Sequence, residues 1–199
     1  MAKGSNDVIL RDRLQFDINS SGDTPLVYGR IDMSDYVSIV VNKGLAVKEV
    51  RFQLRTRDDN DDGVFPNVLT AVDLNAIPAA GAISGQLKIF ATTTAYEQIV
   101  DVGIGSPNVL CVFEKQTTLG GVAGIGAYVD TYEHMYGTPD LHPEGFDIVT
   151  DLLIGIGLEA CSNEALTDTT AELDVMVIAE PKKITQKDLT QMLSQAQDL

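Results

Sequence analysis

The fold is decided by residues 171–199, AELDVMVIAEPKKITQKDLTQMLSQAQDL, in which the periodicity changes at Pro181. Before it, Ala171–Glu180 has strong β character. After it, four apolar residues of Ile184–Leu199 recur at i, i+3, i+4 and i+7: Leu189, Met192, Leu193 and Ala196. That spacing gathers them on one face of an amphipathic helix, and a helix this short is marginal in water unless the face is covered. We expect it to pack on its own domain or on a neighbouring copy, and both alternatives are open.

The start of this helix carries a recognisable signal. Thr185-Gln186-Lys187-Asp188 resembles a capping box with Asp in place of Glu, so Thr185 is expected to cap the first turn. The chain is therefore interpreted as one β domain, residues 1–181, followed by a C-terminal helical arm, residues 182–199.

The chain before Pro181 is interpreted as short strands. Arg13–Ile18 alternates strictly between polar and apolar residues, and Leu45–Leu54 alternates again with a cationic outer face. Phe146–Leu158 is dense enough in apolar residues for a central buried strand. About eight strand candidates at irregular spacing, without βαβ alternation, favour an all-β fold, an eight-stranded jelly-roll sandwich with a short C-terminal α-helix.

The remaining segments complete this assignment. A short helix is expected at Val37–Val41, and a small-residue stretch at Ala76–Gly85. Leu119–Pro143 is glycine-rich and then aromatic, which is typical of a long surface excursion. The other strands are expected at Leu26–Met33, Asn67–Leu74, Gln86–Thr94, Gln98–Val102 and Asn108–Thr118.

The charge distribution excludes one class of function. The formal net charge is -15, and no Lys or Arg occurs from Gln116 to Pro181. Broad binding to nucleic acid uses clustered Lys and Arg, so direct contact with a genome is not expected. The acidic stretch is interpreted as a solvated face, with a cation-dependent contact between subunits as the alternative, and assembly should depend on salt.

The cysteines and the N-terminus bear on where the protein is made. Cys111 and Cys161 both lie among apolar residues and outside any CxxC pattern, which favours buried thiols, with a disulfide between them as the alternative. The N-terminus lacks the apolar core of a signal peptide, and no apolar run is long enough to cross a bilayer. We expect synthesis and assembly in a cytoplasm.

One acidic loop has the composition of a calcium site. Asp58, Asn60 and Asp62 precede Gly63 in a D-x-N-x-D-G arrangement, whose alternating oxygen ligands could wrap the ion. However, Leu69 occupies the position where an EF-hand places its bidentate Glu. An acidic turn is the simpler interpretation, with a structural calcium site as the alternative and no other cofactor expected.

The two histidines offer the main route to an enzyme. His134 and His142 lie in one segment with Glu133, Asp140 and Glu144, a residue set able to hold zinc, although the spacing matches no metallohydrolase motif. No serine lies in a G-x-S-x-G elbow, and no glycine run ends in the Lys-Ser/Thr of a P-loop. The protein is therefore not expected to be an enzyme.

The chain resembles the single-jelly-roll major capsid (coat) proteins of icosahedral viruses, especially compact, acidic ones of archaeal or membrane-containing viruses. The resemblance covers most of the chain and rests on pattern rather than on a signature motif. Its carriers are the strand Arg13–Ile18, the pair Arg30–Met33 and Leu45–Leu54, the strands Phe146–Leu158 and Ala171–Glu180, and the tail Lys182–Leu199.

The resemblance implies a structural protein that self-assembles into the virion shell, with copies of itself and other capsid proteins as partners. Residues Met1–Arg13 hold only three basic residues, unlike the Arg/Lys-rich arms of many small-virus coat proteins. It therefore implies that an internal virion membrane or another protein separates the shell from nucleic acid. The alternative is a carbohydrate- or ligand-binding β-sandwich, assisted by calcium, that uses Tyr128, Tyr132 and Tyr136.

Overall fold

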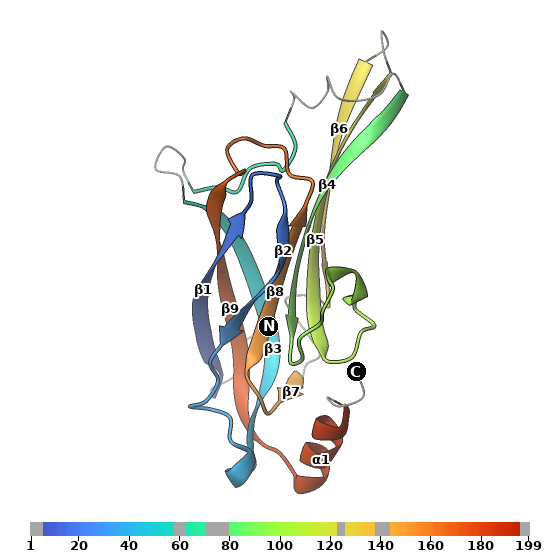
Figure 1. Ribbon diagram of the computed structural model, residues 1–199. Helices are drawn as coiled ribbons and strands as arrows, with labels where there is room; N and C mark the ends of the chain where they lie inside the picture. Colours follow the sequence, from blue (N-terminus) through green and yellow to red (C-terminus); the bar gives the residue numbers. More distant parts are fainter. Residues whose placement is uncertain (1–5, 58–62, 71–79, 123–125, 138–143, 196–199) are drawn as a thin grey trace.

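The computed structural model describes residues 6–57, 63–70, 80–122, 126–137 and 144–195. Two antiparallel sheets pack face to face (Figure 1). The strands of sheet A are β1 (Val8–Ile18), β3 (Lys43–Thr56), β7 (Phe146–Ile148) and β9 (Thr169–Lys183), in the order β1-β9-β3-β7. The strands of sheet B are β2 (Thr24–Ile31), β4 (Ala80–Thr92), β5 (Val109–Val122), β6 (Gly126–Tyr136) and β8 (Leu152–Glu159), in the order β2-β8-β4-β5-β6.

The strand order is that of a jelly roll with one addition. The chain alternates between the sheets except where β4, β5 and β6 follow one another in sheet B. Without β6, the remaining strands form the two interlocked Greek keys of an eight-stranded jelly roll. The sequence prediction of an all-β jelly-roll sandwich with a short C-terminal helix is confirmed, and the ninth strand, β6, lies at the outer edge of sheet B.

The core lies between the sheets, on the inward side of each alternating strand. In β1, Phe16 and Ile18 are buried while Gln15 and Asp17 are exposed, as a period of two requires. The same alternation buries residues of β3 and β9 opposite residues of β4 and β8. Fully buried members include Leu45, Val47, Val50, Leu173 and Val177 from sheet A and Leu87, Ile89, Ile154, Ile156 and Leu158 from sheet B.

The predicted single strand Phe146–Leu158 is wrong, because the chain crosses here from sheet A to sheet B. The break falls between β7 and β8, where Asp151 accepts the backbone N–H of Met33 at 2.9 Å and pairs with Arg30 at 2.5 Å. The sequence pattern hides this crossing, because the apolar residues on both sides of the break, Ile148, Val149 and Leu152, are all buried.

The predicted strand at Gln98–Val102 is also wrong, because residues 93–108 fold over the outer face of sheet B. This segment contains the short 3-10 helix η3 (Ile99–Asp101). A Cβ at Gly157 would lie 2.2 Å from Cδ1 of Ile99, and one at Gly155 would lie 2.1 Å from Cζ of Phe90. The two glycines of β8 therefore admit these side chains onto the sheet.

Three further predictions are corrected. Leu119–Pro143 is not a surface excursion throughout, because β5 continues to Val122 and β6 follows it. Ala76–Gly85 is strand from Ala80 onward, as the start of β4. In the predicted strand Asn67–Leu74, residues 67–70 are not strand: Val68 and Leu69 form a bend and close one end of the core, and residues 71–74 lie outside the described residues.

The C-terminal helix is present as α1 (Gln186–Gln195). Thr185 caps it as predicted, since the backbone N–H of Asp188 donates to Thr185 Oγ1 at 3.2 Å and this hydroxyl donates to Asp188 Oδ2 at 2.6 Å. The expected short helix at Val37–Val41 is a 3-10 turn, η1 (Ile39–Val41). Within the described residues, no helix has the length and apolar character needed to span a membrane.

Candidate assembly surfaces

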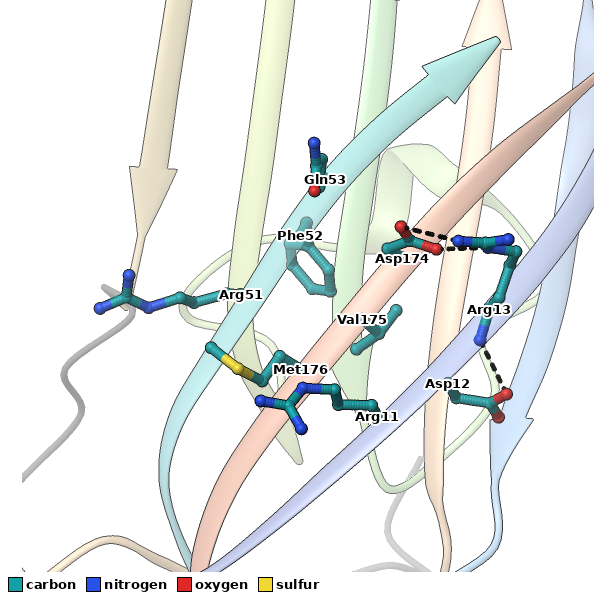
Figure 2. Close-up of a pocket in the computed structure, with 9 residues that line it drawn as sticks. All are labelled: Arg11, Asp12, Arg13, Arg51, Phe52, Gln53, Asp174, Val175 and Met176. Carbon is teal, nitrogen blue, oxygen red and sulfur yellow. Dashed lines mark hydrogen bonds and ion pairs between the residues drawn. The ribbon is translucent and has the colours of Figure 1, made fainter. Parts of the chain in front are cut away.

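A hollow of about 650 Å³ lies on the outer face of sheet A. Cross-strand register builds it in two rows: Arg11, Met176 and Arg51 in one, and Arg13, Asp174 and Gln53 in the next. Figure 2 shows the guanidinium groups of Arg11 and Arg51 on either side of the Met176 thioether. In β3 and β9 the residues between them, Phe52 and Val175, pack toward the core, which places Arg51, Gln53, Asp174 and Met176 outward; in β1, Asp12 between Arg11 and Arg13 is itself exposed.

Most charges of this face are paired within the molecule. Arg13 Nε donates to Asp174 Oδ1 at 2.6 Å, and Arg55 lies 3.5 Å from the same carboxylate. The hydrogen bond from Arg13 and the charges of both arginines lower the pKa of Asp174, and the same bond raises the pKa of Arg13. This network joins β1, β9 and β3, so its first role is structural.

Arg11 differs from its neighbours in the hollow. It forms no hydrogen bond or ion pair with another described residue, whereas Arg51 pairs with Glu49. Together with the apolar surface of Met176, it offers a site for a carboxylate of another molecule.

A second surface lies along β6. The exposed fractions of Tyr128, Val129 and Tyr132 are 55%, 59% and 47%, respectively, and every residue from Tyr128 to His134 is exposed. The ring of Tyr132 stacks on His134 with centroids 5.9 Å apart, and Tyr132 Oη lies 3.1 Å from Tyr136 Oη. Rigid aromatic side chains with polar ends are typical of protein interfaces.

The position of β6 leaves it open. Among the described strands it pairs with β5 alone, over 11 residues. β4 pairs with β8 only from Gln86 onward, so its first residues, with their β5 and β6 partners, project beyond the two-sheet body (Figure 1). The outer edge of β6 presents backbone N–H and C=O groups that a strand of another molecule can bind.

A smaller hollow, of about 340 Å³, lies beside this aromatic row on the outer face of sheet B. Tyr132 forms one wall, and Ile99 and Val100 of η3 form another. Polar side chains between them include Gln86, Gln116 and Glu159. Amides, carboxylates and an aromatic face are groups able to bind a small polar ligand.

Of the four helix residues predicted for assembly, Leu189 and Met192 pack on the molecule's own sandwich. Leu189 is buried together with Ile184 and Val149, and Met192 packs partly buried against this cluster. The Leu193 side chain and all of Ala196 lie outside the described residues. Of the two alternatives for the helix face, the Leu189 side packs on its own domain.

The metal predictions receive no support from the described residues. Asp58, Asn60 and Asp62 lie outside the described residues, as does His142. Where the structure does describe the chain, no three His, Cys, Asp or Glu side chains form a group able to hold a metal ion. His134 stacks on Tyr132 and lies tilted against Tyr136 on β6, and Glu133 pairs with Lys115 at 2.9 Å.

Both cysteines are buried and neither forms a disulfide, as the favoured interpretation predicted. Cys111 lies in β5 and faces the main core. Burial raises the pKa of its thiol to about 12, which makes the thiolate scarce at neutral pH. A nucleophilic role for Cys111 has no basis in this environment.

Sequence reasoning placed the tyrosines in a loop and missed the surface that they form. The signal was present, because Tyr128, Tyr132, His134 and Tyr136 all occupy even positions and therefore one face of a strand.

Comparison with known proteins adds no functional assignment. No protein-family model matches the chain, and no curated protein matches its sequence.

Proposed function

We propose that this protein is a structural coat protein that self-assembles into a virion shell. The observation that carries the proposal is the projecting edge strand β6, with its open backbone edge and exposed aromatic side chains. A long exposed edge is a template for pairing, which monomeric proteins shorten, cover or charge. Here Asp130 and Glu133 are the only acidic residues of β6, and Tyr128, Val129 and Tyr132 stay exposed beside them.

The jelly roll supports the proposal without deciding it, since this fold serves coat proteins, lectins and enzymes alike. It supplies a rigid body with edges at β1, β2, β6 and β7. Repeated lateral contacts through such edges, multiplied over many copies, give a shell its stability. Partners are copies of this chain and other capsid proteins, and no catalytic chemistry is required.

The charge of the chain predicts how assembly responds to salt. Subunits of net charge -15 repel one another, and repulsion between exposed charges weakens as the Debye length falls from about 30 Å at 0.01 M salt to about 10 Å at 0.1 M. The proposal therefore expects monomers or small oligomers at low salt and larger assemblies as salt rises.

The test measures native mass by light scattering across salt, with negative-stain images of each fraction, for the wild type and two lysine variants. Val129→Lys places a charge on the exposed β6 surface, and Val64→Lys is the matched control at a 64% exposed valine outside the sheets. Large assemblies that Val129→Lys abolishes and Val64→Lys preserves support the proposal. A monomer at every salt and protein concentration contradicts it.

A second candidate function, glycan binding, is favoured by the hollow beside Tyr132. Gln86, Gln116 and Glu159 can hydrogen-bond sugar hydroxyls while the Tyr132 ring packs on a sugar face. A glycan array tests this function. Binding to a glycan that Tyr132→Ala abolishes supports it, and a protein that binds no glycan on the array contradicts it.

A further inference from the structure

The elements η1 and α1 lie at the same end of the sandwich (Figure 1). Three consecutive aliphatic residues form the apex of a turn there: Ile39, Val40 and Val41 are 45%, 92% and 58% exposed, respectively. Turns are normally built from polar residues, glycine and proline. A run of exposed apolar residues is unfavourable in water unless another surface covers it. We call Ile39, Val40 and Val41 the apolar tip.

The apolar tip is held rigidly. Ser38 and Lys43 exchange two backbone hydrogen bonds, of 3.0 and 2.9 Å, that close the turn at its base. Asn42 adopts a left-handed conformation and donates its N–H to the Ile39 carbonyl at 3.3 Å. The Asn42 carbonyl accepts the N–H of Ile184 at 2.9 Å, which ties the tip to the segment leading into α1. The exposed aliphatic side chains are thus presented on a fixed support.

Lysines surround the base of the tip. Lys43 and Lys183 are direct cross-strand partners of β3 and β9, and Lys187 lies in the first turn of α1. All three are exposed, and none forms an ion pair or side-chain hydrogen bond with another described residue. Like charges directly opposite each other destabilise a sheet, so an anion near Lys43 and Lys183 relieves that repulsion.

Three acidic groups of this end act on a different lysine, whereas Asp32 and Asp35, in the segment before η1, are exposed. Asp147 pairs with Lys182 at 2.7 Å, and this bond, together with the charges of Glu144 and Asp188, raises the pKa of Lys182. The net charge of the whole chain opposes approach to an anionic surface, but at about 0.15 M salt only charges within about 8 Å of the contact act strongly. Lys43 and Lys183 lie at the contact.

From this geometry we infer that the apolar tip inserts into an anionic lipid bilayer, with Lys43, Lys183 and Lys187 contacting lipid phosphates. An apolar apex with a cationic base matches the order of the bilayer interface, where acyl chains lie beneath charged headgroups. Lysine stems can lie along the apolar region while their ammonium groups reach the phosphates. This contact does not depend on lateral assembly through β6, because a single subunit carries the whole site.

The chain contains no Trp, so Val40→Trp creates a single fluorescent reporter at the most exposed position of the tip. The probes are phosphatidylcholine vesicles with and without phosphatidylglycerol, and vesicles with brominated acyl chains. The expected result is a blue shift with phosphatidylglycerol vesicles and quenching by brominated lipid. Val100→Trp, at a 74% exposed valine of η3, is the matched control and should show neither.

Two further variants test the parts of the site in sedimentation with vesicles. Ile39→Ser/Val40→Ser/Val41→Ser should weaken binding at least about tenfold, because the inserted apolar area is removed. Lys43→Gln/Lys183→Gln should weaken binding to anionic vesicles by about thirtyfold, since each of the two lysines near the surface contributes about fivefold to the attraction. Circular dichroism checks that the variants fold.

Several results would overturn the inference. If no vesicle changes the emission of Val40→Trp, the tip does not insert. If Lys43→Gln/Lys183→Gln binds vesicles with and without phosphatidylglycerol as tightly as the wild type does, the lysines have no role in binding. A blue shift that follows protein concentration without lipid assigns the tip to a contact with a second copy instead. A different result, failure of shell assembly while vesicle binding stays intact, would contradict the proposed coat function and leave this inference standing.

Discussion

The outer face of sheet A and the β6 edge of sheet B differ in how their polar groups are paired. On sheet A, Arg13, Asp174 and Arg55 pair with one another across three strands. On sheet B, residues 93–108 cover the strands beside β8, but β6 stays exposed. Apart from Arg11, the first face is paired within one chain, whereas the second leaves a backbone edge open, which the proposed assembly would cover with another copy. Substitutions that change stability should therefore separate from those that change assembly.

The largest effect on stability is expected under the covered part of sheet B. Gly155→Val places a side chain where a Cβ alone would lie 2.1 Å from Cζ of Phe90. Overpacking of this kind should cost about 3 kcal/mol of the free energy of unfolding. Urea unfolding followed by circular dichroism measures it, and an unchanged midpoint would contradict the close packing on β8.

The second-largest effect on stability is expected in α1. Leu189→Ala should reduce the free energy of unfolding by about 2 kcal/mol, because Leu189 is buried against Ile184 and Val149 in a small cluster. Thr190→Ala, at an exposed position of the same helix, is the matched control. If Leu189→Ala leaves urea unfolding unchanged but prevents assembly, the helix docks on a neighbouring copy rather than on its own sandwich.

A smaller loss of stability is expected when the ion pairs on the outer face of sheet A are broken. Asp174→Asn should cost about 1 kcal/mol at pH 7, a value limited by the partial exposure of the pair. The pKa of Asp174 is lower in the folded protein, so its contribution is present above the unfolded pKa, about 3.9, and is lost as pH falls through the folded pKa. The free energy of unfolding, measured at pH 7 and in acid, should therefore differ less between wild type and Asp174→Asn in acid than at pH 7. A difference that grows in acid would contradict the ion pair.

The smallest effect on stability is expected at β6. Val129→Lys should change the free energy of unfolding by no more than about 0.5 kcal/mol, because the side chain is exposed and makes few contacts to lose. Chemical unfolding of the monomer at low salt measures this. A larger loss would show that β6 supports the fold of its own chain, and would remove the contrast between the two regions.

The sequence predicted the strands that bury one face. β1 and β3 alternate because Phe16 and Val50 enter the core between polar or charged neighbours. The same rule failed at β6, where side chains on both faces are exposed and no apolar alternation arises. It failed again at β7 and β8, where the apolar residues on both sides of Thr150 and Asp151 resemble one strand and conceal a change of sheet.

The candidate surfaces were harder to predict for a different physical reason. The helix face containing Leu189 was found from its spacing, but the cluster that covers it includes Val149, which is distant in sequence. The hollow on sheet A depends on the register of three strands, which places Arg11 and Arg51 beside Met176. Spacing along one segment contains no information about such cross-strand neighbours.

The most direct test of the central claim is hydrogen–deuterium exchange of residues 126–136, compared between the low-salt monomer and the high-salt assembly. Assembly through β6 predicts that its amides gain protection, because the open edge acquires a partner, while amides of β9 in the middle of sheet A change little. Equal exchange of β6 in both states, with new protection elsewhere, would contradict assembly through this edge.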